Sequence, residues 1–250
     1  MLDRYWRIFA TGLSFVLFGL GGVILTLVLI PILVFTRDTE FRRKHGKRLL
    51  KRSFQLFSWG MQFLGVIELR VKGLSRLKSG GSLVLANHPS LIDAVILISL
   101  IENPNGIIKS SLLNNPSMFG LAKISGLLCN VEGPELIRKS IESIKSGDNL
   151  LIFPEGTRTP ALNKISFKRG AAYIAIRGRL NLTPILIFTS EPVLRKGYSW
   201  YEVPSKKPIF DITVMDEINL ASIVDVDGDL IIESEMLTEY LEELYVHELS

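Results

Sequence analysis

The sequence predicts an α/β fold, with a mostly parallel central sheet flanked by helices and an N-terminal membrane-anchoring helix or helical hairpin. Three observations lead to this prediction. Residues 8–36 contain no charged side chain. From residue 67, short apolar runs alternate with segments of helical periodicity, which is typical of parallel strands joined by helices. Two polar motifs, at 86–93 and 153–159, each follow an apolar run, where a parallel sheet tends to bind ligands.

The composition favours a basic, membrane-associated protein with one globular domain and an appendage. Among the 250 residues, 47% are hydrophobic, and the formal net charge is +4. The mean hydropathy is +0.30 and the pI is about 9.1. The single cysteine, Cys129, excludes an internal disulfide and is compatible with a reducing compartment. No cysteines and histidines stand at metal-ligand spacing, so we expect no metal site.

The uncharged stretch at 8–36 is long enough to be a permanent membrane anchor. As one helix it would extend roughly 43 Å at about 1.5 Å per residue, against a hydrocarbon core of about 30 Å. We expect it either to span the membrane with tilt or to bend at Gly19, Gly21 and Gly22 into a re-entrant hairpin. A cleaved signal peptide is excluded, because its apolar region is usually roughly 7 to 15 residues long.

Basic residues flank this stretch and predict its orientation. Two precede it and eight follow it: Arg4 and Arg7, then Arg37, Arg42, Arg43, Lys44, Lys47, Arg48, Lys51 and Arg52. The positive-inside rule predicts that the C-terminal part lies in the cytoplasm, which means the inner or plasma membrane if the protein is bacterial. The position of the basic run also favours contact with anionic headgroups. The apolar stripe that follows is equally compatible with a core or a membrane surface; it comprises Phe54, Phe57, Met61 and Leu64, with Trp59 nearby.

The globular part begins with strands and helices in alternation. Residues 67–73 alternate apolar and polar side chains, as a half-buried strand does, and 82–87 form a short apolar run that suits a buried strand. The segment 91–101 is helical in pattern and is stopped by Asn103 and Pro104. A third strand is expected at 106–112.

The second half continues the same alternation. Helices are expected at 116–125 and 134–147, the latter stopped by Gly147. Residues 149–156 predict a strongly apolar strand that runs into a glycine turn. The remaining expected elements are a helix at 169–179, strands at 182–191 and 208–218, and an amphipathic helix with an acidic face from Glu233 onward. We therefore expect an anchor and basic interfacial segment at 1–65 and a globular domain at 66–250.

The motif ANHPSLID, at 86–93, has two interpretations. In the structural one, Ser90 and Asp93 form a capping box, Asp93 faces the positive end of the helix dipole, and His88 is a bystander. In the catalytic one, Asp93 accepts the ring proton of His88, which leaves the other ring nitrogen free to act as a general base. The sequence has no G-x-S-x-G elbow, and Cys129 has no activating neighbour in sequence. The base would therefore act on a substrate hydroxyl and not on an enzyme nucleophile.

The motif FPEGTRT, at 153–159, favours the catalytic interpretation. It supplies Glu155 and Arg158 at the end of a buried strand. The stretch SFKRGAA then brings Lys168 and Arg169 to the start of a helix, and such a grouping of cations and helix-start amides suits a phosphate. A general base and an anion site behind a membrane anchor together indicate acyl transfer to a lipid hydroxyl.

The sequence resembles the lysophospholipid and glycerol-3-phosphate acyltransferase family, of the 1-acylglycerol-3-phosphate acyltransferase type. NHPSLID resembles the family block N-H-x(4)-D, matched at Asn87, His88 and Asp93. FPEGTRT is similar to the block F-P-E-G-T-R-S, matched from Phe153 through Arg158. FKRGAA and TPILI resemble two later blocks, and the resemblance covers about residues 65 to 190.

The resemblance implies that His88, oriented by Asp93, deprotonates an acceptor hydroxyl that attacks an acyl thioester on acyl carrier protein or coenzyme A. The leading acceptor is 1-acyl-sn-glycerol-3-phosphate, which would become phosphatidic acid. No metal or bound cofactor is implied, and the partners would be membrane lipids and the thioester donor. The residues expected to bind substrate are Asn87, Glu155, Gly156, Thr157, Arg158 and Lys168. Among them, Arg158 is favoured for binding the phosphate.

One departure from the family leaves the acceptor open. Between the two main blocks the family usually has an arginine that helps to hold the acceptor phosphate, whereas the stretch SGLLCNVEGPE at 125–135 has none and contains Glu132. A non-phosphate lipid or glycolipid is therefore an alternative acceptor. Alternatives of other classes are a membrane-tethered thioesterase and a non-catalytic lipid-binding module. A nucleic-acid binder is disfavoured, because the positive charges gather beside the anchor.

Overall fold

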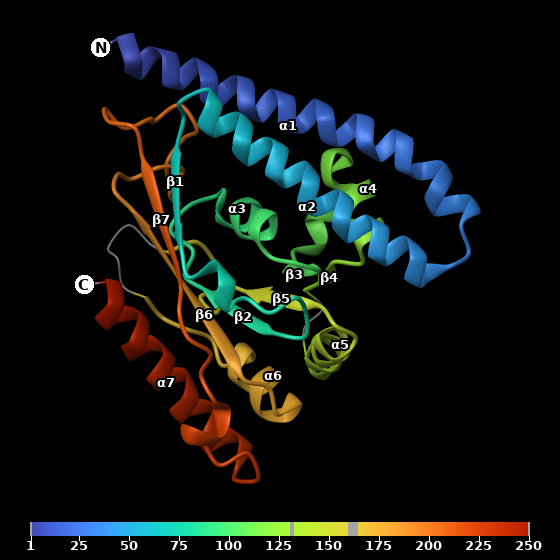
Figure 1. Ribbon diagram of the computed structural model, residues 1–250, viewed down its shortest axis with the longest axis vertical. Coiled ribbons are helices and arrows are strands. Elements are labelled where there is room, and N and C mark those ends of the chain that lie inside the picture. The colour runs from blue at the N-terminus through green and yellow to red at the C-terminus, as the bar shows by residue number, and fades with distance from the viewer. Residues whose placement is uncertain (1, 131–132, 160–164, 250) are drawn as a thin grey trace.

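The structure, a computed structural model, describes residues 2–130, 133–159 and 165–249. A seven-stranded sheet lies at its centre, with helices on both faces (Figure 1). The α-helices are α1 (Leu2–Phe35), α2 (Thr39–Phe63), α3 (Asp93–Leu100), α4 (Pro116–Ser125), α5 (Pro134–Lys145), α6 (Gly170–Gly178) and α7 (Leu230–Leu249). The strands are β1 (Glu68–Lys72), β2 (Leu83–Ala86), β3 (Pro104–Ile108), β4 (Leu128–Cys129), β5 (Asn149–Ile152), β6 (Leu182–Thr189) and β7 (Ile209–Val214).

The sheet is mostly parallel, as the sequence predicts. Its strand order is β1-β7-β6-β2-β5-β3-β4, and every neighbouring pair is parallel except β6 and β7. The carboxyl ends of β2, β5 and β6 therefore meet at one edge of the sheet. The predicted third strand begins earlier than expected, at Pro104, because a proline is tolerated at the first position of a strand. The two-residue strand β4 is too short to leave a periodic signal in the sequence.

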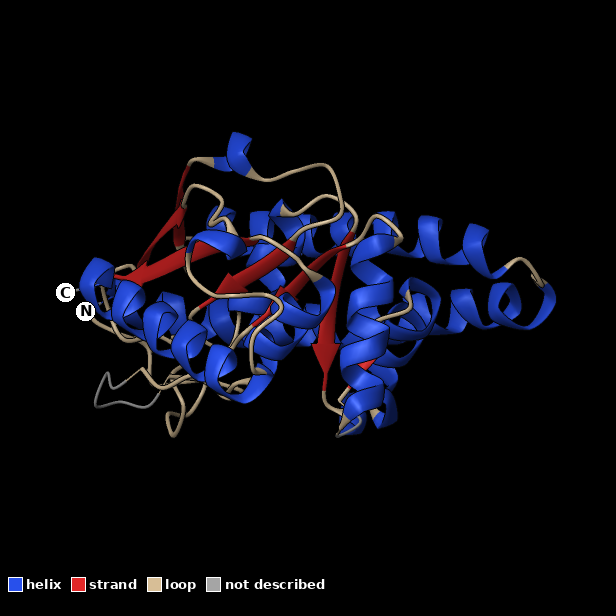
Figure 2. Cartoon of the chain, turned by 90° about the horizontal axis from the view of Figure 1, so that it is seen from below, coloured by secondary structure: helices blue, strands red, loops and turns tan. Residues whose placement is uncertain are grey.

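Alternating side chains divide the interior into two apolar clusters, one on each face of the sheet. Val84 and Ala86 of β2 join a cluster that includes residues of α1, α2, α3 and α4. Leu83 and Leu85 point to the opposite face, where they join a cluster formed with α6 and α7. Figure 2 shows the sheet between these helices, with the turn between α1 and α2 extending beyond it.

The N-terminal helix α1 is continuous, so the expected bend at the glycines is wrong. Gly22 serves close packing instead, since a Cβ at this position would lie 2.2 Å from the Ser117 carbonyl oxygen of α4. Among the described residues, α1 is the one helix long and apolar enough to cross a membrane. It packs against α2 and α4 and turns into α2 at 36–38, where the Asp38 side chain accepts a hydrogen bond from the Phe41 N–H at 2.8 Å.

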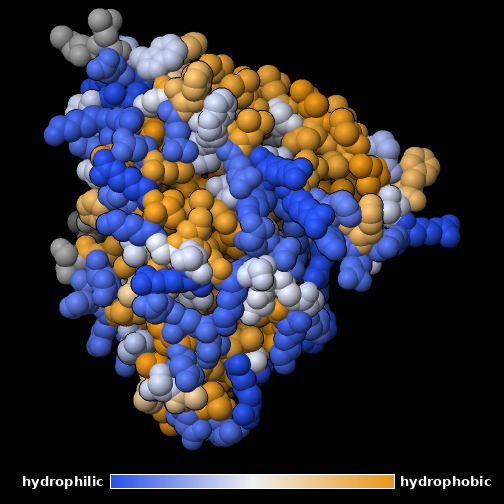
Figure 3. Space-filling model, viewed as in Figure 1, coloured by the Kyte–Doolittle hydropathy of each residue, from blue (hydrophilic) through white to orange (hydrophobic). Residues whose placement is uncertain are grey.

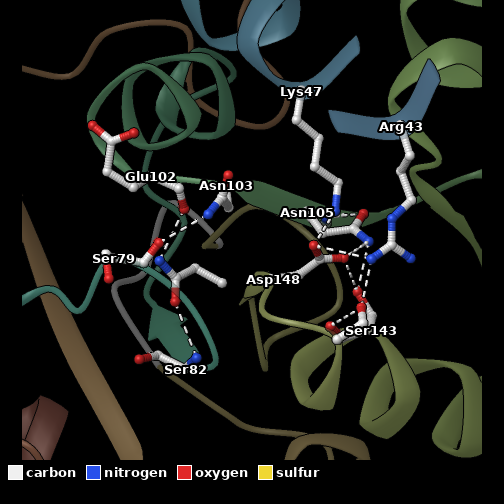
Figure 4. Close-up of polar contacts among 12 residues, drawn as sticks. Arg43, Lys47, Ser79, Ser82, Glu102, Asn103, Asn105, Ser143 and Asp148 are labelled. Atoms are coloured by element: carbon white, nitrogen blue, oxygen red, sulfur yellow. Dashed lines mark hydrogen bonds and ion pairs between the residues drawn. The ribbon is translucent and has the colours of Figure 1, made fainter. Parts of the chain in front are cut away.

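Part of the basic run in α2 holds the sheet and does not face solvent. The Lys47 ammonium, which is buried, forms an ion pair with Asp148 at the start of β5 (Figure 4). Asp148 also accepts hydrogen bonds from the Ser143 hydroxyl at 2.6 Å and from the Asn105 amide at 3.2 Å. Burial lowers the pKa of Lys47, an effect that the facing carboxylate opposes. The expectation that the whole run contacts headgroups is therefore corrected, while Lys44, Arg48 and Arg52 remain exposed.

The apolar stripe of α2 also divides between the interior and the surface. Phe54 and Met61 are 3% and 1% exposed and belong to the core, whereas Trp59 and Phe63 are 58% and 75% exposed. Phe54 and Met61 of the stripe therefore lie in the core, whereas the neighbouring Trp59 and Phe63 are exposed near the C-terminal end of α2.

Candidate active site

The two polar motifs lie side by side because they follow neighbouring parallel strands. The 87–93 segment follows β2 and the 153–159 segment follows β5, and these strands pair in parallel. The Thr159 N–H donates to the His88 carbonyl oxygen at 2.7 Å, which joins the two segments directly. Motifs separated by about 65 residues in sequence thus form one site at the carboxyl edge of the sheet.

His88 and Asp93 form a hydrogen-bonded pair at the start of α3. The Nδ1 of His88 lies 2.9 Å from Asp93 Oδ2, and the His88 side chain is 17% exposed while that of Asp93 is fully buried. An ionised Asp93 assigns the proton to Nδ1, so that Nε2 carries the lone pair. Among the described residues, no group forms a hydrogen bond with Nε2. The pair therefore presents a basic nitrogen on the open side of the site.

The same aspartate oxygen also fixes the turn that precedes the helix, because Asp93 Oδ2 accepts the Ser90 N–H at 2.6 Å. The expected capping box is wrong: the N-cap of α3 is Ile92, which has no side-chain cap hydrogen bond, and the Ser90 hydroxyl has no hydrogen-bond partner within the described residues. Burial raises the pKa of Asp93, and the hydrogen bonds from His88 and Ser90 oppose that rise. Asp93 Oδ2 thus joins the ring of His88 to the backbone of the turn that leads into α3.

Glu155 holds the two motifs together from below the site. It is 4% exposed, and its Oε1 accepts the His88 N–H at 2.8 Å and the Thr159 hydroxyl at 2.9 Å. Its Oε2 is buried and has no hydrogen-bond partner within the described residues. Burial raises the pKa of Glu155, an effect that the two donors oppose. Glu155 therefore positions the His88 backbone, and its expected contact with substrate remains a prediction.

The side-chain amide of Asn87 is hydrogen-bonded to the neighbouring strand β6. Its amide nitrogen donates to the Ile187 carbonyl oxygen and its amide oxygen accepts the Ile187 N–H, each at 2.8 Å. The side chain is 3% exposed and joins the end of β2 to β6. In this arrangement Asn87 fixes the strand end from which His88 projects, and substrate contact by Asn87 remains a prediction.

Arg158 is held by the loop that follows β6. Its Nη1 donates to the carbonyl oxygens of Leu194 and Arg195, at 3.0 and 3.2 Å. The Leu194 oxygen also accepts the Leu91 N–H from the HPSLID turn at 3.1 Å. Arg158 thus links the second motif to this loop with one nitrogen, Nη1, and its expected contact with a phosphate remains a prediction.

The remaining predicted substrate residues lie at the rim of the site. Gly156 adopts φ +67°, and the Lys168 side chain covers it so closely that a Cβ would lie 3.1 Å from the lysine Cδ. Thr157 and Lys168 are exposed. Arg169, in contrast, pairs with Glu235 on α7 at 2.8 Å and so points away from the site.

One neighbour of the histidine was missed as a site residue. The Phe153 ring stacks on the His88 imidazole, with the ring centroids 4.1 Å apart and the planes inclined by 23°. Its position inside the FPEGTRT motif is the only signal that the sequence offers for this contact. Together with Asp93, this ring holds the imidazole in one orientation.

The stretch that lacks the family's arginine is partly outside the described residues. Cys129 is half-buried in β4, and the Asn130 N–H donates to the Ile108 carbonyl oxygen at 2.7 Å. Val131 and Glu132 lie outside the described residues, so the expected repulsion of a phosphate by Glu132 stays a prediction. Within the part of the chain that the structure describes, no group of three or more His, Cys, Asp or Glu side chains is arranged to hold a metal ion.

Comparisons with known proteins agree with this fold. Residues 68–188 match the family model described as Acyltransferase. The chain is 28% identical over 150 residues to the 1-acyl-sn-glycerol-3-phosphate acyltransferase of Pseudomonas aeruginosa, covering 57% of this chain and 58% of that protein. It is 26% identical over 148 residues to the enzyme of the same name from Saccharomyces cerevisiae, covering 55% and 48%.

A solved structure shares the fold over the whole chain. The 1-acyl-sn-glycerophosphate (LPA) acyltransferase PlsC from Thermotoga maritima superposes with a TM-score of 0.72 at 19% identity, covering 99% of this chain and 96% of that one. The resemblance to the acyltransferase family and the predicted fold class are both confirmed. The chain spans about half the length of the two relatives that it matches.

Proposed function

We propose that this protein is a membrane-bound O-acyltransferase that moves an acyl group from a thioester to a lipid hydroxyl. The observation that carries the proposal is the His88–Asp93 pair, whose free Nε2 lies at the open edge of an acyltransferase-type sheet. The acyl donor would be a thioester of acyl carrier protein or coenzyme A. The relatives' printed names support 1-acyl-sn-glycerol-3-phosphate as the acceptor.

In the proposed reaction, His88 works as a general base and then as a general acid. Nε2 takes the proton of the acceptor hydroxyl while its oxygen attacks the thioester carbonyl carbon. The carbon–sulfur bond then breaks, and the departing thiolate takes the proton back from Nε2, which leaves an ester and a free thiol. Asp93 accepts the Nδ1 proton throughout and stabilises the imidazolium that forms. The stacked Phe153 keeps the imidazole in the plane that this transfer needs.

A non-phosphate acceptor is the second candidate. Two observations favour it: the stretch at 125–135 contains no arginine, and Nη1 of Arg158 is used by backbone carbonyls. A phosphate acceptor would depend on the remaining Arg158 donors and on the exposed Lys168. Which acceptor is used therefore depends on how many positively charged side chains can contact the acceptor's headgroup.

We also propose that the apolar face of α1 attaches the protein to the membrane, with the globular part in the cytoplasm. This helix exposes a row of large apolar residues, each 55% to 63% accessible: Val16, Leu17, Leu20, Ile24, Leu27 and Val28. Figure 3 shows an apolar band in the region of α1. Contiguous apolar surface of this kind marks a membrane or protein contact.

An acyl-transfer assay on the purified protein in detergent tests the chemistry. Labelled thioesters of acyl carrier protein and coenzyme A are offered with lysophosphatidic acid, a monoacylglycerol and a glycolipid. We expect His88→Ala to lower transfer by roughly 10²- to 10⁴-fold, as loss of a general base does. His45→Ala, which changes an exposed histidine of α2, is the matched control and should keep full activity.

The acceptor panel separates the candidates. Transfer to lysophosphatidic acid supports the phospholipid acceptor, and transfer only to a phosphate-free lipid supports the second candidate. Thioester hydrolysis without any transfer, lost in His88→Ala, would instead indicate a thioesterase. Equal rates in wild type and His88→Ala would refute the catalytic role of the histidine.

A further inference from the structure

The loop between β6 and β7 carries an exposed group of aromatic side chains beside the N-terminal helix. We call residues 195–207 the aromatic loop. Within it, Tyr198, Trp200 and Tyr201 are 45%, 49% and 55% exposed. Large aromatic side chains that are exposed on a loop do not stabilise the core. We therefore expect them to contact another molecule or a membrane.

The aromatic loop is fastened to α1 and does not move as a free segment. The Arg4 Nε donates to the Val203 carbonyl oxygen at 3.1 Å, and the Arg7 Nη2 donates to the Pro204 carbonyl oxygen at 3.1 Å. Arg7 also donates to the Ser205 carbonyl oxygen and is only 6% exposed. The two arginines that precede the apolar stretch are therefore used to hold this loop.

Trp200 extends the apolar face of α1. Its ring lies over Gly12, where a Cβ would be 3.0 Å from the ring atom Cζ3. Together they border an apolar hollow of about 320 Å³, lined by Ile8, Phe9, Gly12, Leu13, Val16 and Trp200. Phe9 and Val16 in this lining are 60% and 55% exposed, so the surface is continuous from the helix onto the loop.

The charges around these aromatic residues favour an anionic surface. The loop carries Arg195, Lys196, Lys206 and Lys207 against a single acid, Glu202. The exposed Glu202 carboxylate accepts the Ser199 N–H of its own turn, and Lys207 pairs with Glu68 at 2.9 Å, so the excess of positive charge rests on Arg195, Lys196 and Lys206. Amphipathic aromatic rings with neighbouring lysines are the composition found at the headgroup level of membranes.

We propose that the aromatic loop is a second membrane-contacting element, which inserts Tyr198, Trp200 and Tyr201 at the headgroup level of an anionic phospholipid bilayer. The carbonyl oxygen of Leu194, the residue before the loop, accepts hydrogen bonds from Arg158 and from the Leu91 N–H of the HPSLID turn. Contact at this loop therefore places the candidate active site directly at the bilayer surface, where a lipid acceptor lies. The inference rests on the membrane attachment proposed above.

Depth-dependent quenching of Trp200 fluorescence tests the inference. The full chain carrying Trp6→Phe and Trp59→Phe has Trp200 as its one tryptophan. It is added to phosphatidylcholine–phosphatidylglycerol vesicles with and without bromine on the upper acyl carbons. The control carries Trp200→Phe as well, together with Tyr240→Trp on α7. Flotation of the same samples measures vesicle attachment.

We expect Trp200 to lose emission in brominated vesicles and to shift to shorter wavelength, while the tryptophan at position 240 does neither. If the protein floats with the vesicles but Trp200 emission is equal with and without bromine, the loop is not a contact and the inference fails, while attachment by α1 stands. Failure to float overturns both. A shift that needs no vesicles and grows with protein concentration would assign the surface to a second copy, which also overturns it.

A second comparison guards against a folding defect in the multiple variant. Trp6 donates its indole N–H to the Leu64 carbonyl oxygen at 2.9 Å, a bond that Trp6→Phe removes. Wild type and Trp200→Phe alone are therefore measured in parallel, and the difference between their quenching curves gives the Trp200 contribution. Equal quenching in the two proteins would refute the proposal without any change at Trp6.

Discussion

Two buried carboxylates hold His88 in the candidate site. Asp93 contacts the ring of His88, and Glu155 contacts the backbone N–H of the same residue. The histidine is thus held at two points by groups that come from different motifs. A buried ionisable group with a specific partner at a sheet edge is a candidate for function, which fits both residues.

We predict that Asp93→Asn lowers acyl transfer by roughly 10²- to 10⁴-fold while the protein stays folded. The asparagine oxygen, placed as Oδ2 is, still accepts the Ser90 N–H and so preserves the turn before α3. The same oxygen can still accept the Nδ1 proton, but a neutral amide supplies no charge to stabilise the imidazolium, and its NH₂ takes the place of Oδ1, which is buried without a hydrogen-bond partner within the described residues. Steady-state rates and Tm in detergent check this.

Ser90→Ala is the matched control for that variant, because the Ser90 hydroxyl has no partner within the described residues. It should leave both the rate and Tm close to those of the wild type. Unchanged activity in Asp93→Asn would show that the aspartate serves only to hold the turn before α3.

Glu155→Gln should change the pH dependence of stability. Burial raises the pKa of Glu155 above its ordinary value of 4.5, so between that value and the raised one the folded state binds more protons than the unfolded state. Stability of the wild type therefore falls as pH rises through this window, and the raised pKa of Asp93 acts in the same direction above 3.8. Glutamine at position 155 does not titrate.

We therefore expect Tm of Glu155→Gln minus Tm of the wild type to increase as pH is raised from about 4 to about 8. The exposed Glu243→Gln serves as the control, measured over the same range by thermal unfolding in detergent. A difference that is constant with pH would contradict the burial argument.

At the scale of elements, the three helices α1, α2 and α4 pack through small residues. Cβ atoms at Gly22 and Gly46 would lie 2.2 Å and 2.4 Å from carbonyl oxygens of α4, and one at Gly120 would lie 2.6 Å from Thr26 of α1. The Thr26 hydroxyl also donates to the Pro116 carbonyl oxygen at 2.7 Å and accepts the Gly120 N–H at 3.0 Å. Polar bonds thus join the middle of α1 to the start of α4.

Gly22→Ala should lower Tm, because the added Cβ meets α4 backbone that has no flexible end to move aside. Overpacking of this kind typically costs about 1–3 kcal/mol. Gly21→Ala is the matched control one position away, where a Cβ would meet nothing within 4 Å. Alanine there should keep Tm or raise it slightly, by its higher helix propensity. Equal Tm values for the two variants would argue against close α1–α4 packing.

The whole molecule is arranged so that α1 lies along the protein. Its 34 residues would extend about 51 Å, yet Ala10, Ser14, Thr26 and Leu29 are all buried against the rest of the chain. A helix that is packed against the protein along its length presents only one apolar face to a membrane. To cross the membrane it would have to break that packing. We therefore expect both ends of α1 on the same side of the bilayer.

Cysteine labelling tests this arrangement. In a Cys129→Ser background, Asp3→Cys and Arg37→Cys place one thiol at each end of α1. When the protein is added to preformed vesicles, a membrane-impermeant maleimide should label both variants from outside to the same extent. Labelling of one end only after the vesicles are lysed would show that α1 crosses the membrane.

Much of the fold could be predicted from local sequence, and so could the makeup of the candidate site. The helix expected at 116–125 agrees with α4, whose start is capped by the Asn115 side chain and whose end is marked by Gly126. His88 and Asp93 meet because a turn of four residues separates His88 from Asp93, the first residue of α3. The roles of the site residues and the boundary between residues 65 and 66 stay predictions.

The predictions that failed depend on contacts between distant segments. Lys47 was expected to face lipid, yet it pairs with Asp148, a residue 101 positions away whose burial no local pattern reveals. A bend of α1 at Gly19, Gly21 and Gly22 was one of the two arrangements expected, because a glycine that allows a bend and one that allows close packing look alike in sequence.

The sequence by itself determined the class of fold, the N-terminal apolar helix and the pairing of His88 with Asp93, because periodicity and short spacings act within a few residues. Only the tertiary structure decided that α1 lies against α4, that Arg158 holds the loop after β6, and that Glu155 supports His88. These contacts depend on how the strands and helices are placed around the sheet. That placement is set by packing of apolar faces over the whole chain, and not by the residues on either side of each contact.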